Sequence, residues 1–206
     1  MSKLLHISAS PRGERSESLA IARTFVDEFR EAHPEIEVSE FDLWDGTLPA
    51  FGPDAVAAKM AVFAGEEPVG DGWRNAVDTF RRFDDADLYL FSVPMWNHGV
   101  PYILKQFIDV VSQPGLVFGF DPAEGYTGLL RGKKAAVIYT SAVYGPERGP
   151  SFGTDFQAPY FGDWLRWAGV ADVEEIHFRP NLATADAATG REAAHTQARD
   201  LAKRFA

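Results

Sequence analysis

Short apolar runs alternate with amphipathic helical segments along this 206-residue chain, and this alternation constrains the fold more than any other feature. Three of the runs have the continuous apolar character that is typical of strands buried on both faces of a sheet, whereas 36–43 is a moderate strand signal and 173–178 alternates. They cover residues 3–8, 36–43, 88–93, 135–139 and 173–178. Parallel strands need helical crossovers between them. The alternation therefore predicts an α/β fold in which helices cover both faces of a parallel sheet.

Helices are predicted wherever apolar residues recur three and four positions apart. The first follows Ser16 or Ser18, either of which can cap it, and ends before Pro34. The others are expected over residues 54–63, 73–84, 101–111, 160–167 and 191–205. Five strands joined in this way suit the flavodoxin-like three-layer sandwich with strand order 2-1-3-4-5. Because no linker interrupts the chain, we expect a single domain over residues 1–206.

The chain has no cysteine. This excludes a thiol nucleophile, a disulfide framework, a cysteine-ligated zinc ion and an iron–sulfur cluster. The five histidines do not follow HExxH or another metal-ligand spacing, so we expect no metal site.

The formal net charge is −10, which argues against a broad nucleic-acid surface, because such a surface needs clustered lysine and arginine. No stretch approaches the roughly 18 apolar residues of a membrane span. The apolar run at the N-terminus is too short for a signal peptide. We therefore expect a cytoplasmic protein with neither a membrane nor a nucleic acid as partner.

Three loops follow the strands that end near Ser8, Val93 and Tyr139, and in an open parallel sheet such loops meet at the ligand site. The first, loop 8–18, is rich in hydroxyl groups and arginines and enters a helix N-terminus, which favours an anion. It lacks the GxGxxG and Walker A patterns. It therefore suits a terminal phosphate monoester, the alternative being a serine-rich turn with an ordinary helix cap.

The second loop, 94–101, offers a flat surface in Trp96 and both donors and acceptors in Asn97. Together they suit a planar heterocycle with a uracil-like edge. Core packing for Trp96 and a turn role for Asn97 are the alternatives. His98 is either a proton donor or a solvent-facing histidine. The third loop, 140–146, either lines the ring from the opposite side or is a simple strand-end turn.

Together these loops resemble those of the FMN-dependent NADH-azoreductases, flavodoxin-like flavoenzymes that also reduce quinones. The resemblance extends from Lys3 into the terminal helix. Its most specific part is Pro-Met-Trp-Asn-His at 94–98 followed by Pro-Tyr-Ile-Leu-Lys-Gln-Phe-Ile-Asp at 101–109. The family has a similar Pro-Met-Tyr-Asn-Phe loop and then a Leu-Lys-aromatic-aromatic-Asp helix. Residues 128–135 and the serines of loop 8–18 also match.

The resemblance implies an FMN-dependent enzyme that takes a hydride from NADH and passes it, in a ping-pong cycle, to azo compounds or quinones. It further implies a homodimer with flavin sites at the subunit interface. The flavin itself carries the hydride, so no catalytic side chain is required, and His98 is a candidate proton source. The implied FMN contacts are Ser10, Ser16, Glu17, Ser18, Met95, Trp96, Asn97, His98 and Ser141. The implied substrate side holds Phe118 and Tyr144.

The sequence departs from the family pattern in two places. Trp96 and His98 replace the usual Tyr and Phe. After Ser141, Ala142-Val143-Tyr144 replaces the family's Arg-Gly-Gly, which affects how closely the backbone can approach a flavin. The sequence leaves open whether the natural acceptor is a quinone or an azo compound, and it contains no rule that separates NADH from NADPH.

Two other functions stay open at this point. Residues 149–153 match GxSxG, which would make Ser151 the nucleophile of a serine hydrolase, although a nucleophile elbow must join a strand directly to a helix. A non-enzymatic electron carrier of the flavodoxin type would also bind flavin, and its acidic surface would suit a basic redox partner. Carriers are usually smaller, whereas this chain has long segments at 44–72 and 115–131.

Overall fold

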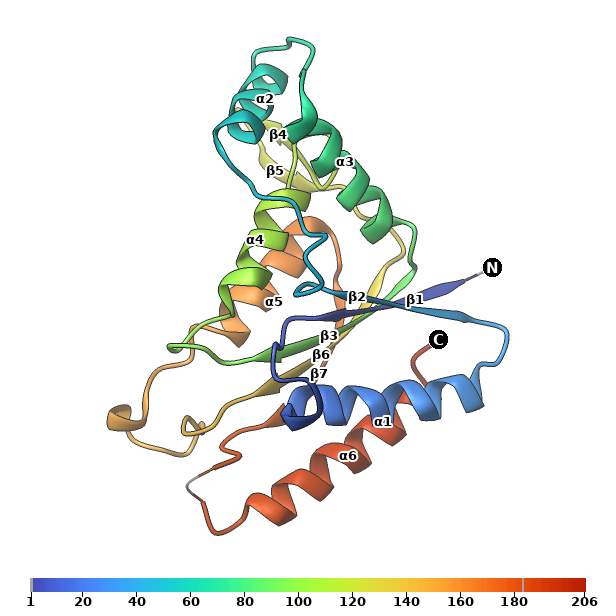
Figure 1. Ribbon diagram of the computed structural model, residues 1–206, viewed down its shortest axis with the longest axis vertical. Coiled ribbons are helices and arrows are strands. Elements are labelled where there is room, and N and C mark those ends of the chain that lie inside the picture. Colours follow the sequence, from blue (N-terminus) through green and yellow to red (C-terminus); the bar gives the residue numbers. More distant parts are fainter. Residues whose placement is uncertain (1, 183) are drawn as a thin grey trace.

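The computed structural model describes residues 2–182 and 184–206 and has the predicted five-stranded parallel sheet (Figure 1). Its strands are β1 (Lys3–Ser8), β2 (Glu37–Asp42), β3 (Leu88–Pro94), β6 (Lys134–Thr140) and β7 (Asp172–Phe178). The order β2-β1-β3-β6-β7 is the predicted order 2-1-3-4-5. The helices are α1 (Glu17–Ala32), α2 (Pro53–Phe63), α3 (Asp71–Asp84), α4 (Tyr102–Val111), α5 (Ala158–Ala168) and α6 (Ala187–Lys203).

Two apolar cores lie on opposite faces of the sheet, as the alternation of side chains along a strand requires. Leu4 of β1 belongs to the core with α1 and α6, whereas its neighbour Leu5 belongs to the core with α3, α4 and α5. Figure 1 shows the same division, with α1 and α6 below the sheet and α3, α4 and α5 above it. The central strands are buried on both sides, which explains their continuous apolar sequences.

Helix α1 shows how the sequence fixes one of these layers. Ser16 caps it by accepting a hydrogen bond from the Leu19 N–H at 3.3 Å. Phe25 and Phe29 lie one turn apart on its buried face, with ring centroids 5.9 Å apart. Burying each such ring contributes about 2–3 kcal/mol. Because this face anchors α1 to the sheet, the N-terminus of α1 is held at the carboxyl end of β1.

A two-stranded antiparallel hairpin stands apart from the main sheet: β4 (Phe118–Asp121) and β5 (Gly125–Gly128). The sequence does not predict this hairpin, because the two strands are only four residues long and together contain three glycines. Asp121 closes its turn by accepting hydrogen bonds from the N–H groups of Ala123 and Glu124 at 2.8 and 3.1 Å. The hairpin lies with α2 at the far end of the molecule from α6 (Figure 1).

The strand register brings the three loops to one edge of the sheet. Ser8 pairs with Asp42 on one side and with Ser92 on the other, and Pro94 of β3 pairs with Thr140 of β6. The carboxyl ends of β1, β3 and β6 are therefore level. None of the helices in the described residues combines the length and apolar character needed to cross a bilayer.

Candidate functional site

Loop 8–18 holds an unusual set of hydroxyl groups. Ser10, Ser16 and Ser18 are all buried, and the Ser16 and Ser18 hydroxyl oxygens lie 3.1 Å apart. The Ser10 hydroxyl is buried without a hydrogen-bond partner among the described residues. Such a group costs free energy unless something satisfies it. A buried, unsatisfied hydroxyl beside a helix N-terminus fits a phosphate group, so the chain meets the phosphate requirement of FMN at this point.

Glu17, the remaining predicted phosphate contact, turns its side chain toward α6. Its carboxylate accepts two hydrogen bonds from Arg191, at 2.5 and 3.0 Å. These bonds hold the pKa of Glu17 below its usual value. Because Arg191 occupies the carboxylate, the group of Glu17 that remains available to an anion is its backbone N–H, in the first turn of α1.

A buried histidine that the sequence analysis did not single out lies beneath loop 8–18. His6 of β1 has its Nε2 atom 2.8 Å from the Ser92 hydroxyl oxygen, which lies 3.5 Å from the Ser18 carbonyl oxygen. Burial lowers the pKa of His6 to about 4, and the charge of Arg23 acts in the same direction. His6 is therefore neutral at pH 7 and connects β1, β3 and the start of α1.

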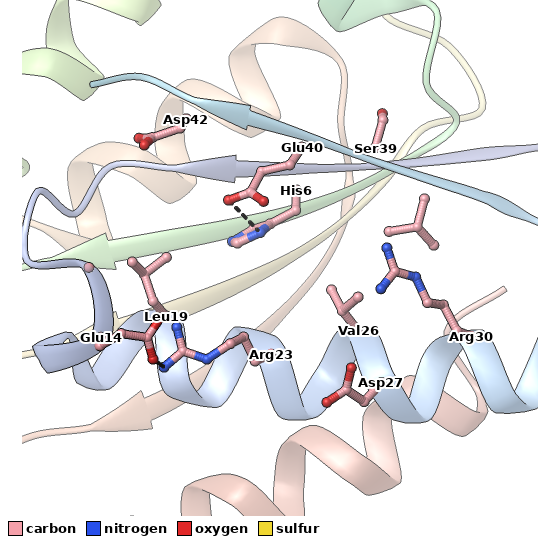
Figure 2. A pocket seen from close by; sticks show the side chains of 12 residues that line it. His6, Glu14, Leu19, Arg23, Val26, Asp27, Arg30, Ser39, Glu40 and Asp42 are labelled. Atoms are coloured by element: carbon pink, nitrogen blue, oxygen red, sulfur yellow. Dashed lines mark ion pairs between the residues drawn. The ribbon is translucent and has the colours of Figure 1, made fainter. Parts of the chain in front are cut away.

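Figure 2 shows the cavity of about 660 Å³ that His6 borders, between α1 and the edge strand β2. His6 and Glu40 point toward each other there, with Nδ1 and a carboxylate oxygen 3.8 Å apart. On the α1 side, Arg23 faces Glu14 at 3.5 Å. The cavity mixes both signs of charge and does not adjoin loops 94–101 and 140–146, so it is separate from the site that those loops form.

Loop 94–101 contains a tight hairpin turn. Trp96 and Gly99 exchange two backbone hydrogen bonds of 2.9 Å each. Asn97 and His98 between them have φ angles of 46° and 72°. Two consecutive positive φ values define a type I′ turn, for which Asn is favoured at the first position and Gly is usual where His98 stands. The turn exposes the Asn97 and His98 side chains, and its strain points to function rather than to packing.

Contacts from both neighbouring loops fix this turn. The Met95 N–H donates to the Thr140 carbonyl oxygen at 2.7 Å, and the Phe156 N–H donates to the His98 carbonyl oxygen at 2.9 Å. The His98 ring lies against Gly153, where an added Cβ atom would be 3.3 Å from Nε2. The conformation of the turn is therefore coupled to loop 140–146 and to loop 149–157.

Loop 140–146 is tied down on its other side by the segment that follows β7. The Ser141 hydroxyl accepts a hydrogen bond from the Tyr144 N–H at 3.1 Å. The Ser141 carbonyl accepts one from the Asn181 N–H at 2.8 Å. Gly145 sits so close to Pro180 that an added Cβ atom would lie 2.7 Å from the proline ring. The loop therefore has a fixed course despite lacking the glycine pair expected of the family.

A cavity of about 410 Å³ opens between these loops. It brings together five predicted residues: Met95, Asn97, His98, Ser141 and Tyr144. Its remaining lining comes from Ala142, Val143, Pro150, Ser151, Phe152 and Gly153. The lining combines polar groups, such as Asn97 and Ser141, with apolar side chains, such as Val143 and Phe152, as a planar heterocycle requires.

Besides the four predicted phosphate contacts of loop 8–18, two predicted residues, Trp96 and Phe118, lie outside this cavity. Trp96 packs with Trp44 and Tyr102, at centroid distances of 5.9 and 6.3 Å. Phe118 starts the β4–β5 hairpin and lies 4.9 Å from the Trp167 ring. Within one chain, Phe118 is thus not assembled with Tyr144, its predicted companion on the substrate side.

The site does not support a serine hydrolase. Strand β6 ends at Thr140, whereas Ser151 lies in the short 3-10 helix η2 (Pro150–Phe152). A nucleophile elbow would place the serine on the turn that directly follows the strand. In the described part of the chain, histidines and carboxylates do not gather in groups of three or more that could hold a metal ion.

Comparison with known proteins agrees with this geometry. The profile of a family described as having a flavodoxin-like fold matches residues 2–202. An FMN-dependent NADH:quinone oxidoreductase from Ruegeria pomeroyi is 43% identical over 197 residues, which cover 94% of this chain and 97% of that protein. FMN-dependent NADH:quinone oxidoreductase 9 from Burkholderia lata is 37% identical over the full length of both chains. The crystal structure of an azoreductase from Bacillus anthracis covers both chains completely, with a TM-score of 0.89 and 25% identity.

Proposed function

Because this chain belongs to the flavodoxin-like family, we propose that it is an FMN-dependent NADH:quinone oxidoreductase that also reduces azo compounds. One observation carries the proposal: the unsatisfied, buried Ser10 hydroxyl and the cavity between loops 94–101 and 140–146 lie at the same carboxyl edge of the sheet. A phosphate and a planar ring joined by a short chain need sites arranged in this way.

The phosphate would be held by Ser10, Ser16, Ser18 and the Glu17 backbone. When bound, FMN supplies the redox chemistry, taking two electrons from NADH and delivering them to the acceptor in a ping-pong cycle. The protein binds, orients and shields the reactants. Asn97, Ser141 and the backbone of the 96–99 turn provide polar contacts for one edge of the ring.

His98 is the residue of this cavity best suited to move a proton. It lies at the cavity wall, and its conformation is fixed by the turn and by Gly153. Tyr144 would shape the acceptor side directly, whereas Phe118, which is buried in its own chain, would act there through the β4–β5 hairpin that it supports in a second subunit. Trp96 would complete the wall through its packing with Trp44 and Tyr102.

The same proposal includes a cytoplasmic homodimer in which each chain is one domain over residues 1–206. Two exposed aromatic residues of the β4–β5 hairpin, Phe120 and Tyr126, support an interface near the predicted substrate side. Sedimentation velocity on the purified protein tests the dimer, since a monomer at micromolar concentration would contradict it.

The visible absorption spectrum of the purified protein, before and after anaerobic addition of NADH, tests the function. We expect a flavin spectrum that bleaches with NADH and returns when a quinone or an azo dye is added. A colourless protein that FMN cannot restore would contradict the proposal. Bleaching that is reversed only by a protein partner would instead identify an electron carrier.

A further inference from the structure

Arg179 forms a buried ion pair that the flavin site does not explain by itself. Arg179 directly follows β7, and its Nη1 atom donates a hydrogen bond to Oδ2 of Asp155 at 2.7 Å. The two side chains are only 7% and 16% exposed. Burying both charges carries a desolvation penalty that can exceed their attraction, so such a pair is weak evidence for stability alone.

Asp155 connects this pair to one wall of the 410 Å³ cavity. Its second oxygen accepts hydrogen bonds from the N–H groups of Gln157 and Ala158, at 2.9 and 3.0 Å, and so caps α5. The next residue, Phe156, is bonded to the His98 carbonyl oxygen. Asp155 therefore fixes the end of loop 149–157, which carries Ser151, Phe152 and Gly153 into the cavity.

Arg179 connects the pair to the opposite wall. Its guanidinium carbon lies 5.5 Å from the ring centroids of both Tyr139 and Tyr144, close enough for cation–π attraction. Tyr139 is the next-to-last residue of β6, and Tyr144 lines the cavity. The Nη2 atom of Arg179 also donates to Nδ1 of His177 at 2.5 Å, which fixes the guanidinium plane.

We propose that the Arg179–Asp155 ion pair sets the separation of the two cavity walls, so that Arg179 is a positioning residue for the flavin ring. The proposal rests on the proposed function and deepens it. The guanidinium lies within cation–π distance of Tyr144 on one wall, while its ion pair holds loop 149–157 on the other. Through Phe156 the same pair also fixes the His98 turn, which joins both walls.

The test compares Arg179→Gln with Arg204→Gln in the full-length protein. Arg204 also pairs with a carboxylate at 2.7 Å, that of Glu174 in β7, but on the surface and away from the cavity. Three quantities are measured: the Kd of FMN for the apoprotein by fluorescence quenching, the visible circular dichroism of the bound flavin, and hydrogen exchange of peptides spanning residues 145–157 without FMN.

We expect Arg179→Gln to raise the Kd of FMN at least tenfold, to alter the flavin dichroism and to speed exchange in residues 145–157. Arg204→Gln should change each quantity by less than a factor of two. Arg179→Lys, which keeps the charge but not the planar fork, should recover part of the affinity. The double variant Arg179→Met/Asp155→Asn leaves no unpaired buried charge. We expect it to fold even if Arg179→Gln, which leaves Asp155 unpaired, does not.

In the double variant the Kd of FMN should stay higher than in the wild type. Removing both charges does not restore the planar guanidinium that contacts both cavity walls. Wild-type dichroism and Kd in a folded Arg179→Gln or double variant would overturn the inference. If the wild-type protein binds no FMN, the proposed function fails. The hydrogen-exchange comparison then still decides whether Arg179 orders the loop.

Discussion

The Nε2 atom of His6 lies 2.8 Å from the hydroxyl oxygen of Ser92, close to loop 8–18, whose serines we propose as the phosphate site. This contact joins β1 to β3 at the point where both strands run toward the candidate site. The Ser18 carbonyl oxygen lies 3.5 Å from the same hydroxyl group. The protonation state of His6 therefore bears on the stability of the fold and on the geometry of loop 8–18.

We predict that His6 makes the protein acid-sensitive. Burial lowers its pKa from 6.5 to about 4 in the folded protein, so between these values the unfolded chain binds the proton more tightly. The contribution of neutral His6 to the free energy of unfolding is fully present above about pH 6.5 and is lost as the pH falls toward 4. The loss amounts to about 3 kcal/mol. Urea unfolding of the wild type and of His6→Gln from pH 7 to 4 measures it.

The control for this experiment is His33→Gln, which removes the half-buried C-cap histidine of α1, whose Nε2 lies 3.1 Å from the Ala202 carbonyl oxygen. The wild type and His33→Gln should lose stability in parallel between pH 6.5 and 4, and His6→Gln should lose less. Equal slopes for all three proteins would show that His6 titrates normally.

Replacing Ser10 by Ala should weaken FMN binding without lowering the stability of the apoprotein. It is buried without a partner among the described residues, so Ser10→Ala removes an unsatisfied group and leaves the free energy of unfolding of the apoprotein unchanged or slightly higher. A hydrogen bond to phosphate contributes about 1.5–3 kcal/mol, so the Kd of FMN should rise by about tenfold or more.

Fluorescence titration of the apoprotein gives the Kd, and thermal unfolding gives the stability. Ser39→Ala, on the exposed edge strand β2, serves as the control and should change neither quantity. A Ser10→Ala protein that is destabilised yet binds FMN normally would mean that Ser10 has a structural role only.

The sequence predicted the features that arise from local patterns, and it missed those that depend on contacts between residues far apart in the chain. The strand order was predictable, because each buried strand is a continuous apolar run and the crossovers between them are long enough for helices. The meeting of loops 94–101 and 140–146 followed from the same topology, and it needed only local patterns and one general rule about strand ends. The choice of Met95, Asn97, His98, Ser141 and Tyr144 within these loops rested on the resemblance to the azoreductase family.

The remaining features depend on contacts between distant residues. His6 looks like one polar residue in an apolar strand, and the pairing of Asp155 with Arg179, 24 positions later, leaves no local signature. The β4–β5 hairpin escaped prediction because its four-residue strands contain Gly119, Gly125 and Gly128. The packing of Trp96 on Trp44 joins two loops whose relative position only the folded sheet determines.

His98 is expected to contribute a proton during reduction of the acceptor. Replacing it by Phe keeps an aromatic ring at the cavity wall but removes the ionisable group. We expect His98→Phe to flatten the pH dependence of kcat for a quinone or azo acceptor while the Kd of FMN changes by less than about threefold. Steady-state kinetics from pH 5 to 9 measures this. The same curve in the variant as in the wild type would rule out the role.

Because Phe tolerates a φ of 72° less well than His, thermal unfolding should show His98→Phe to be less stable than the wild type, by less than the roughly 1–3 kcal/mol that the conformation itself costs. His98→Asn provides the matched variant, since Asn tolerates this conformation better and also lacks an ionisable ring. Both variants should show the same flattened pH profile despite their different stabilities.

The β4–β5 hairpin offers a test of packing that is independent of the cofactor. An added Cβ atom at Gly128 would lie 2.5 Å from the backbone of Trp167, Ala168 and Gly169, whereas one at Gly119 meets nothing closer than 3.9 Å. Neither glycine has a positive φ, so strain of that kind is not involved. Gly128→Ala must therefore push the hairpin away from the end of α5.

We expect Gly128→Ala to lower the free energy of unfolding by about 2–3 kcal/mol, since overpacking against rigid backbone cannot be relieved by a side-chain rotation. Gly119→Ala, in the paired strand of the same hairpin, should stay within about 0.5 kcal/mol of the wild type. Chemical denaturation of the two variants measures both values. Equal stabilities would mean that the hairpin does not pack against α5 as closely as Gly128 and Trp167 indicate.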